Sequence, residues 1–490
     1  MSYFAKQIGK IDQRYLFIYY LLFLIVSLIA LVGLGNANQL RNFKSNDSEI
    51  RLIIEGNGTQ NILSDYYNII PSEVFINGIK DDSCIKKCFL PEEKNNVTIK
   101  FTNQINSIAN MFRDLENITQ IDLSDLDTSK VSRMFFMFRN CKNVEKIYFG
   151  NINTSSVESF EYLFYGCRNL KSVDLSKFDT SKVTSMYAMF ALCLNLEKIN
   201  FGNFNTSSLE NMRSLFYDCY KLTSIDLSSF DTSKVTTFQM MFYNCNNLIS
   251  IDISNFDCTS VTTMELMFRN CYNLEKVNFG SINTSSLKNM ESLFYGCTNL
   301  KSVDLSKFDT SKVTSMFAMF ALCSNLETIN FGNINTSAVE NTRSMFYGCS
   351  KLSVLDLSSF DTSKVTTFQW MFARCSNLKY LNISHFNTSS LTNIFKMFIY
   401  CDSLIFLNLF SKDFNDSIND TQAFNDLRTK AKTRFCIKDD DTQQFFLEKY
   451  KIISACSDPC FNESNKKVDI INNTCIGSCL QNGFWYEYNT

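Results

Sequence analysis

Residues and motifs that usually carry enzymatic chemistry are scarce in this chain. A single histidine, His385, stands among 490 residues, so a Ser-His-Asp or Cys-His arrangement is not expected. Neither GxGxxG nor GxxxxGK[ST] occurs, which excludes the two common glycine-rich loops that bind nucleotide phosphates. We therefore expect no enzymatic activity and no cofactor.

Flexible linkers and a basic surface are missing as well. Only three prolines and fifteen glycines are present, which argues against long flexible linkers. Lys and Arg number 47 against 49 Asp and Glu, giving a net charge of −2, so no surface for nucleic acid is expected. The 45% hydrophobic content is ample for a core.

What the sequence does contain is a 26-residue repeat marked by cysteine. A phenylalanine precedes each of these cysteines by three residues, and a further coil at the start has Phe112 with Leu115 in place of the cysteine. The cysteines are Cys141, Cys167, Cys193, Cys219, Cys245, Cys271, Cys297, Cys323, Cys349, Cys375 and Cys401. A fixed period of this length predicts a solenoid, here of twelve coils.

The apolar spacing within one coil predicts its parts. Leu222, Ile225 and Leu227 have the LxxIxL spacing of a leucine-rich-repeat strand. An Asp or Asn and a Thr-Ser turn follow, and then residues 235–242 carry apolar side chains three to four apart, which suits a short helical turn. We therefore predict an α/β-type leucine-rich-repeat solenoid, each coil being a parallel strand, a corner and a short helical turn.

A longer period shows how the array grew. Residues 172–186 are identical to residues 302–316, and the sequence of 138–141 recurs at 268–271. A block of five coils was therefore duplicated, which suits a binding or spacer surface better than an active site.

These coils resemble a known family. The string MFxxCxxLxxIDLSxFDTSxVTxM, present with small departures at residues 241–264, is similar to the BspA-like leucine-rich repeats of microbial and protist surface proteins. The resemblance implies a solenoid on the cell surface that mediates adhesion to host proteins or other cells, and no catalytic residues.

The N-terminal region predicts membrane insertion. Residues 15–34 carry no charge, and twenty apolar residues span about 30 Å. Residues 1–14 contain Lys6, Lys10 and Arg14, so this flank should stay in the cytoplasm. The run is either an anchor, which leaves the repeats on the outer face of the plasma membrane, or a signal peptide cleaved after Ala37, which makes the protein secreted.

Segments without the repeat flank the solenoid at residues 108–410. Residues 48–107 have strand-like runs at 50–54, 74–76 and 97–101, and should cover the apolar edge of the first coil. Residues 411–450 suit a C-terminal cap, and 451–490 a cysteine-rich module. Disulfides are favoured over metal sites in both flanks. The candidate cysteines are Cys84, Cys88, Cys456, Cys460, Cys475 and Cys479.

The cysteine column itself favours buried free thiols. Side chains stacked in parallel point the same way, which does not suit the dihedral angle of a disulfide, and thiols pack as small apolar groups. Cys258 lies outside the column, in a corner, and is the better candidate for a reactive thiol.

Polar side chains should line the outer face of the strands. They are Asp122, Asp174, Asn200, Asp226, Asp252, Asn278, Asp304, Asn330, Asp356 and Asn382. One interpretation is a mildly acidic strip that binds a partner, such as a protein or glycan on another cell or matrix, or Ca²⁺. The other is a solvated face that recurs because the coil was copied.

The corners add candidate glycosylation sites. Asp or Asn there starts a turn by accepting a hydrogen bond from the backbone ahead, and each Asn version reads Asn-Thr-Ser, an acceptor sequence. These residues are Asn153, Asn205, Asn283, Asn335 and Asn387. Three hypotheses follow: an adhesion or recognition protein, a structural cell-coat glycoprotein, or an enzyme with its site in the flanking segments.

Overall fold

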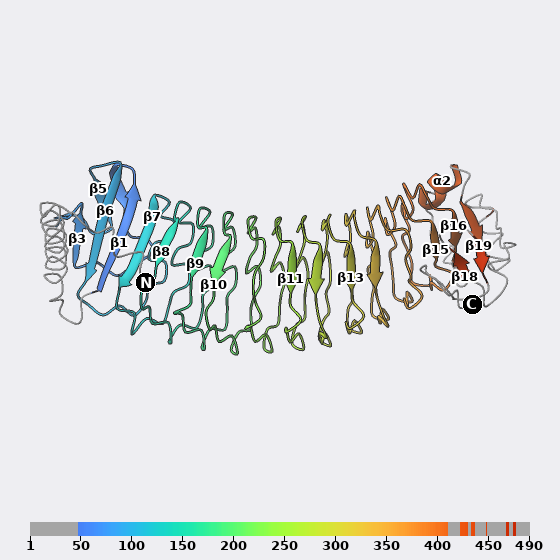
Figure 1. Ribbon diagram of the computed structural model, residues 1–490, viewed down its shortest axis with the longest axis horizontal. Coiled ribbons are helices and arrows are strands. Elements are labelled where there is room, and N and C mark those ends of the chain that lie inside the picture. The colour runs from blue at the N-terminus through green and yellow to red at the C-terminus, as the bar shows by residue number, and fades with distance from the viewer. Residues whose placement is uncertain are drawn as a thin grey trace, which may run out of the picture.

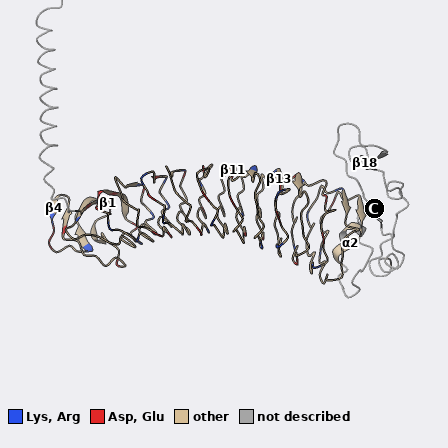
Figure 2. Ribbon diagram, turned by 90° about the horizontal axis from the view of Figure 1, so that it is seen from below, with Lys and Arg blue, Asp and Glu red and all other residues tan. Residues whose placement is uncertain are grey.

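The computed structural model describes residues 48–409, 422–429, 433–436, 447, 467–469 and 474–476. The chain winds into a long, gently curved solenoid (Figure 1). Charged residues of both signs are spread along its length (Figure 2). Within the described ranges, no helix has the length and apolarity needed to cross a bilayer. Residues 1–14 and 15–34 and the proposed cleavage after Ala37 lie outside these ranges.

One face of the solenoid carries short parallel strands. The strands are β7 (Ile118–Asp125), β8 (Lys146–Tyr148), β9 (Ser172–Asp174), β10 (Lys198–Asn200), β11 (Ser250–Asp252), β12 (Lys276–Asn278), β13 (Ser302–Asp304), β14 (Thr328–Asn330), β15 (Tyr380–Asn382), β16 (Phe406–Asn408) and β17 (Arg434–Cys436). Paired residues from β7 to β16 lie one repeat apart in the sequence, as Val173 and Ile199 do. The repeat period thus sets the register.

This sheet is interrupted, which differs from the prediction of a strand in every coil. Three separate two-stranded sheets form in the middle of the solenoid: β9 pairs with β10, β11 with β12, and β13 with β14. Among the described residues, the coil that contains Leu222, Ile225 and Leu227 has no strand. In the coil of Asp356, the strand position has an isolated bridge, at Val354, in place of a strand. The LxxIxL spacing therefore predicted the inward-facing side chains correctly. It did not predict that strand hydrogen bonds are missing from some coils.

The predicted helical turn is wrong, because the return segment of each coil is a run of β-turns. Met240 and Asn244 have φ of 57° and 56°, and the same two positions are left-handed in all twelve coils. In an α-helix each N–H would bond four residues back. Here the amide of Phe242 donates to Met267 O in the next coil at 2.9 Å, whereas that of Cys245 donates to Phe242 O at 3.1 Å. Contacts between coils therefore replace a helix.

A column of phenylalanines forms the centre of the core. Successive rings from Phe112 to Phe398 are stacked, with centroids from 5.3 Å apart at Phe164–Phe190 to 6.0 Å at Phe320–Phe346. All of these rings are fully buried. In-register stacking of the coils, predicted from the repeat, is confirmed.

The N-terminal segment joins the first coil through a shared sheet. Its strands are β1 (Ser48–Glu55), β2 (Gly58–Asn61), β3 (Glu73–Ile76), β4 (Ile79–Lys80), β5 (Lys87–Leu90) and β6 (Lys94–Phe101). The order of the six-stranded sheet is β4-β3-β6-β1-β7-β8, with β1 antiparallel to β7. A disulfide joins Cys84 to Cys88, with Cα atoms 4.9 Å apart. The edge of the first coil is thus paired with β1.

At the C-terminal end of the solenoid, helix α2 (Gln422–Thr429) continues the phenylalanine column and places a leucine at the cysteine position. Phe424 follows Phe398 by one repeat period, and their ring centroids are 5.7 Å apart. Leu427 follows Cys401 by the same period and is buried, as Leu115 is in the first coil. β17 then pairs in parallel with β16. The structure therefore contains part of a thirteenth coil, which the position of Phe424 in the repeat could have indicated.

Little of the cysteine-rich module is described. Its β18 (Lys467–Asp469) and β19 (Thr474–Ile476) are antiparallel. Cys456, Cys460 and Cys479, together with the side chain of Cys475, lie outside the described residues.

Candidate functional site

The side chains of the polar row on the strand face also accept hydrogen bonds from the backbone. Asp174 Oδ1 accepts the amide of Ser176 at 2.9 Å, and Asn200 Oδ1 accepts that of Gly202 at 3.2 Å. The same contact recurs from Asp122 to Asn382 along the row. Hydrogen bonds from the Ser176 amide and hydroxyl lower the pKa of Asp174. The carboxylate of Asp174 is therefore ionised at neutral pH, and part of its hydrogen-bonding capacity is used within its own turn.

Neighbouring Asp and Asn coils are also matched to each other. The side-chain amide of Asn200 donates to Asp174 Oδ1 at 3.0 Å, and Asn278 and Asn330 contact Asp252 and Asp304 in the same way. Gly202 has φ +58°, and a Cβ there would lie 2.5 Å from Ser176 Cα. A coil that carries Asn-Phe-Gly, such as residues 200–202, thus fits closely against the preceding coil, which carries Asp-Leu-Ser at residues 174–176. The presence of both Asp and Asn in this row therefore has a structural explanation.

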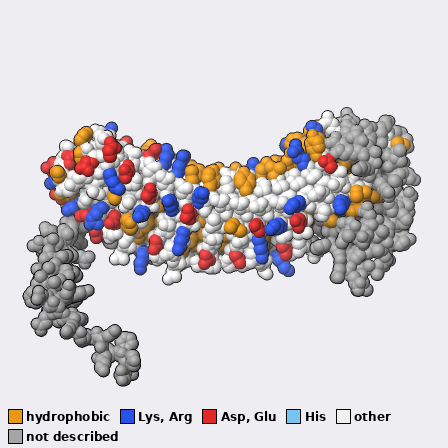
Figure 3. Space-filling model, turned by 45° about the horizontal axis from the view of Figure 1, so that its top comes forward, with side chains coloured by type: hydrophobic (Ala, Val, Ile, Leu, Met, Phe, Trp, Pro, Cys, Tyr) orange, Lys and Arg blue, Asp and Glu red, His pale blue; other side chains and the backbone are white. Residues whose placement is uncertain are grey.

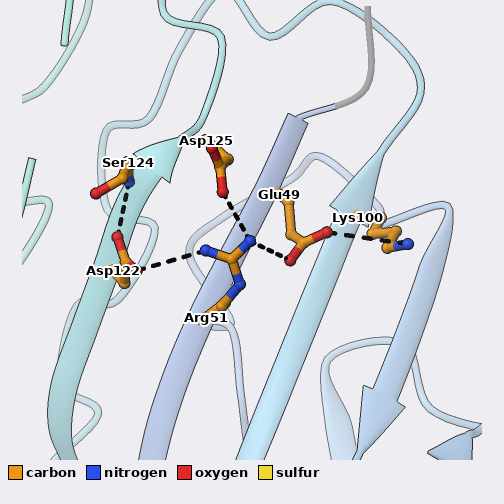
Figure 4. Close-up of polar contacts among 6 residues, drawn as sticks. All are labelled: Glu49, Arg51, Lys100, Asp122, Ser124 and Asp125. Carbon is orange, nitrogen blue, oxygen red and sulfur yellow. Dashed lines mark hydrogen bonds and ion pairs between the residues drawn. The ribbon is translucent and has the colours of Figure 1, made fainter. Parts of the chain in front are cut away.

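The structure places the predicted binding-face residues in different environments. Asp174, Asn200, Asp226, Asp252, Asn278, Asp304, Asn330 and Asp356 are exposed, whereas Asp122 and Asn382 are half-buried. Asp122 lies 3.5 Å from Arg51, which also pairs with Asp125 and Glu49 at 2.7 Å each (Figure 4). Among the described residues, no group of three or more His, Cys, Asp or Glu could hold a metal ion.

The corner asparagines have the turn geometry expected of them. Asn153 Oδ1 accepts both the amide and the hydroxyl of Ser155, at 3.0 and 2.7 Å. The corresponding amide contact occurs at Asn205, Asn283, Asn335 and Asn387. Asn387 is half-buried and the other four are exposed.

The cysteine column consists of buried free thiols. Each Sγ donates to a phenylalanine carbonyl of the preceding coil, as Cys193 does to Phe164 O at 3.1 Å. Burial raises the pKa of Cys193 and of the other column thiols from Cys141 to Cys375. Thiolate formation is therefore suppressed from Cys141 to Cys375.

Cys258, predicted to be a better candidate for a reactive thiol than the column cysteines, is protected as well. Its side chain is fully buried, and burial raises the pKa of Cys258 to about 12. Cys258 occupies the position that Thr232 and Thr284 hold in neighbouring coils, inside the corner rather than on its surface. A thiol protected in this way reacts slowly.

A second row of side chains, on the turn runs, was missed by the sequence analysis. The guanidinium group of Arg269 lies over the ring of Tyr295, 4.0 Å from its centroid, and Arg213 lies over Tyr187 at 5.7 Å. Hydrophobic side chains gather along the concave edge of the solenoid, with Lys and Arg beside them (Figure 3). The signal in the sequence was the recurrence of these arginines in both copies of the five-coil block.

Two solved structures show a distant likeness to this chain. A leucine-rich repeat protein from Eubacterium ventriosum ATCC 27560 is 17% identical over 51% of this chain and 75% of that chain, with a TM-score of 0.25. The structure of a TLR13–ssRNA13 complex is 15% identical over 63% of this chain and 54% of that chain, with a TM-score of 0.22. No curated protein matches the chain.

A family model, by contrast, covers most of the chain. It matches residues 85–172, 143–250, 241–331, 271–354 and 322–434, which together run without a gap from 85 to 434. The matched region includes all twelve coils and the α2 segment. The chain therefore belongs to the family described as "Mycoplasma protein of unknown function, DUF285".

Proposed function

We propose that this protein is a non-catalytic recognition or adhesion protein displayed outside the cell. The observation that carries the proposal is the solenoid itself, whose rows of side chains recur along its length on a continuous core. Solenoids of this kind offer extended binding surfaces. The resemblance of residues 241–264 to BspA-like repeats supports a role at the cell surface.

Display outside the cell rests on the N-terminal sequence. The uncharged run 15–34 follows Lys6, Lys10 and Arg14, an arrangement that keeps the basic flank in the cytoplasm. Protease added to intact cells should therefore degrade the repeats. Repeats that survive until the cells are lysed would contradict the assignment.

A pull-down tests recognition. The full chain would be immobilised and exposed to proteins and glycans from neighbouring cells, with the same chain unfolded by heat as the control. A partner that the folded chain retains and the unfolded chain does not is the expected result.

A second candidate is a structural cell-coat glycoprotein that spaces or shields. It is favoured by the exposed corner asparagines Asn153, Asn205, Asn283 and Asn335, which lie in acceptor sequences. Under this alternative, the pull-down retains nothing, and mass spectrometry finds glycans at these residues.

A further inference from the structure

Strongly exposed apolar side chains gather in the N-terminal cap, residues 48–107. Ile79, Ile85 and Phe89 expose 75%, 50% and 64% of their surface, and all three fall within one short stretch of sequence. In the coils, large apolar side chains that are exposed to this degree are spread along the solenoid. Single exposed apolar residues are normal on a soluble protein, whereas a group of them marks an interaction site.

The fold holds these three side chains on the outside of the cap. Ile79 begins β4, the strand at the outer edge of the six-stranded sheet. Ile85 lies in the loop that the disulfide between Cys84 and Cys88 closes, and Phe89 is on the exposed face of the β2–β5 pair. The cap lies at the end of the molecule opposite α2 (Figure 2). We call Ile79, Ile85 and Phe89 the cap patch.

Protein contacts within the described part of the chain leave the cap patch uncovered. Tyr66 is also exposed but differs from it, because the guanidinium group of Arg113 lies over its ring, 4.0 Å from the centroid. Pairing of β4 with a strand of a second copy is disfavoured, because β4 has two residues and one of them is Lys80. Short edge strands and lysine side chains oppose such pairing.

Two lysines near the cap patch already have partners. Lys80 Nζ lies 3.2 Å from carboxylate oxygens of Glu73 and Asp82, and Lys86 Nζ donates a hydrogen bond to Tyr67 O. Their charges are therefore less available to an anionic ligand. A partner that contacts the cap patch should be held by apolar contact rather than by charge.

The sequence before the cap indicates the source of such contact. The uncharged run 15–34 is long enough to cross a bilayer, and β1 begins at Ser48. Residues 35–47 reach at most about 45 Å when fully extended. An anchor at 15–34 would therefore keep the cap close to the membrane surface.

We propose that the cap patch inserts into the headgroup region of the bilayer that holds residues 15–34, and that the coils extend away from the membrane. This inference rests on the display outside the cell proposed above, in its anchored form. Binding at a membrane surface grows with the apolar area buried there, and the anchor makes this contact intramolecular. The exposed Lys87 fits the arrangement, because a lysine can keep its charge in water while its stem lies on an apolar surface.

Tryptophan fluorescence of the full chain, reconstituted in phosphatidylcholine vesicles, tests the proposal. Ile85→Trp and Phe89→Trp each place an indole in the cap patch, and bromine atoms on the acyl chains of the lipid quench an indole that reaches them. The added emission should fall by about half or more, because interfacial side chains lie about 5 to 10 Å deep, at the boundary of headgroups and acyl chains. The wild-type chain, which has two tryptophans, gives the baseline.

Ile249→Trp is the matched control. Ile249 has the same residue type as Ile85 and the same exposure, 51% against 50%. Its coil follows the first coil by five repeat periods, which places it about 24 Å farther along the solenoid at the strand spacing of about 4.8 Å. The emission of this variant should be unchanged by the brominated lipid.

A second set of variants removes the apolar contact. Ile79→Ser with Ile85→Ser, made in the Phe89→Trp chain, should reduce the quenching, because less apolar surface is left to enter the lipid. Ile249→Ser with Tyr272→Ser, made in the same chain, removes two exposed apolar side chains from the coils and should leave the quenching unchanged. Circular dichroism would verify that each variant is folded.

Four results would overturn the inference. The chain does not float with the vesicles; the two cap variants are not quenched; Ile249→Trp is quenched equally, as expected if the solenoid lies flat; or the cap variants shift to shorter wavelength without quenching, as expected if a second copy or residues 15–34 cover the patch. The pull-down tests the proposed function separately. A chain that retains a partner but shows no quenching keeps its recognition function, whereas a quenched chain that retains no partner loses that function alone.

Discussion

The hydroxyl of Thr206 bridges two coils through both polar backbone atoms of Asp231. Its Oγ1 donates to Asp231 O at 3.0 Å and accepts from Asp231 N at 2.7 Å. Equivalent threonines link most neighbouring corners, for example Thr232 to Asp257 O at 3.0 Å. The next coil has Cys258 at this position, so the bridge to Asn283 is missing from the hydrogen bonds of the described residues.

Replacing Cys258 by Thr should restore this bridge. We expect Cys258→Thr to raise the free energy of unfolding by about 1 kcal/mol, the usual net value of one hydrogen bond, as measured by urea unfolding. Cys271→Thr is the control, because Cys271 lies in the column, where no coil has threonine. It should destabilise the protein. Loss of stability in both variants would show that the corner has relaxed around the thiol.

The phenylalanine column can be tested at its middle and at its end. Phe294→Ala should cost about 3 to 5 kcal/mol of unfolding free energy, because it leaves a cavity in a closely packed core. Phe294 stacks on Phe268 and Phe320 at 5.6 and 5.7 Å, whereas Phe112 stacks on one ring of the described residues, that of Phe138, at 5.9 Å.

Phe112→Ala should cost less than Phe294→Ala by about 0.5 to 1.5 kcal/mol, the value of one aromatic pair. Phe112 is itself fully buried, so the difference between the two variants reports the missing stacked ring and not exposure to solvent. Denaturant unfolding of both variants gives the comparison, and equal losses would mean that stacking adds nothing to burial.

The stacked core could be predicted from the sequence because a constant Phe and Cys spacing leaves only one register that buries both. The return segment could not. Apolar residues three to four apart fit a helix and equally fit successive turns, and the choice depends on bonds between coils such as Phe242 N to Met267 O. Gly166, Asn244 and Gly296 before their cysteines were the available signal, because glycine and asparagine tolerate the left-handed conformation.

The candidate site, like the fold, was predicted only in part from the sequence. The outward Asp and Asn positions followed from the alternation of side chains along a strand, and eight of the ten are exposed. The arginine–aromatic contacts were missed. Arg213 and Tyr187 lie one repeat period apart in the sequence, and their side chains come together when consecutive coils stack.

Left-handed residues before the cysteines offer a third prediction. Leu322 has φ +61°, a conformation that costs most residues about 1 to 2 kcal/mol. Leu322→Gly should remove this strain and also the side chain that faces the next coil. Gly348 has φ +74°, and a Cβ there would lie 2.9 Å from Leu322 Cδ2, so Gly348→Ala should destabilise the protein.

The double variant separates strain from contact. If the clash matters, Gly348→Ala should cost less in the Leu322→Gly background than in the wild type, and the difference is the interaction energy of a double-mutant cycle. Thermal unfolding measures all four proteins. Identical costs in both backgrounds would assign the whole effect to the backbone of Gly348.

Stability at alkaline pH provides the last prediction. Burial raises the pKa of column thiols such as Cys167 and Cys349, and raises that of Cys258 to about 12. In the unfolded chain a thiol ionises near pH 8.5. The buried neutral thiols therefore leave stability unaffected below that pH, and stability is lost as pH rises from about 8.5 toward the folded-state pKa, because the unfolded state loses protons that the folded state keeps.

The loss from each buried thiol should begin near pH 8.5 and approach about 1.4 kcal/mol per pH unit at higher pH, where the unfolded-state thiol is fully ionised. Urea unfolding at pH 8, 9 and 10 under reducing conditions should show a steep fall, and Cys193→Ala should make the fall shallower by one thiol's share, although it also lowers stability at pH 8. All other titrating groups are common to both proteins, so the difference in slope isolates the thiol. Equal slopes in the two proteins would mean that Cys193 is ionised or oxidised in the folded coil, contrary to its burial and its hydrogen bond to Phe164.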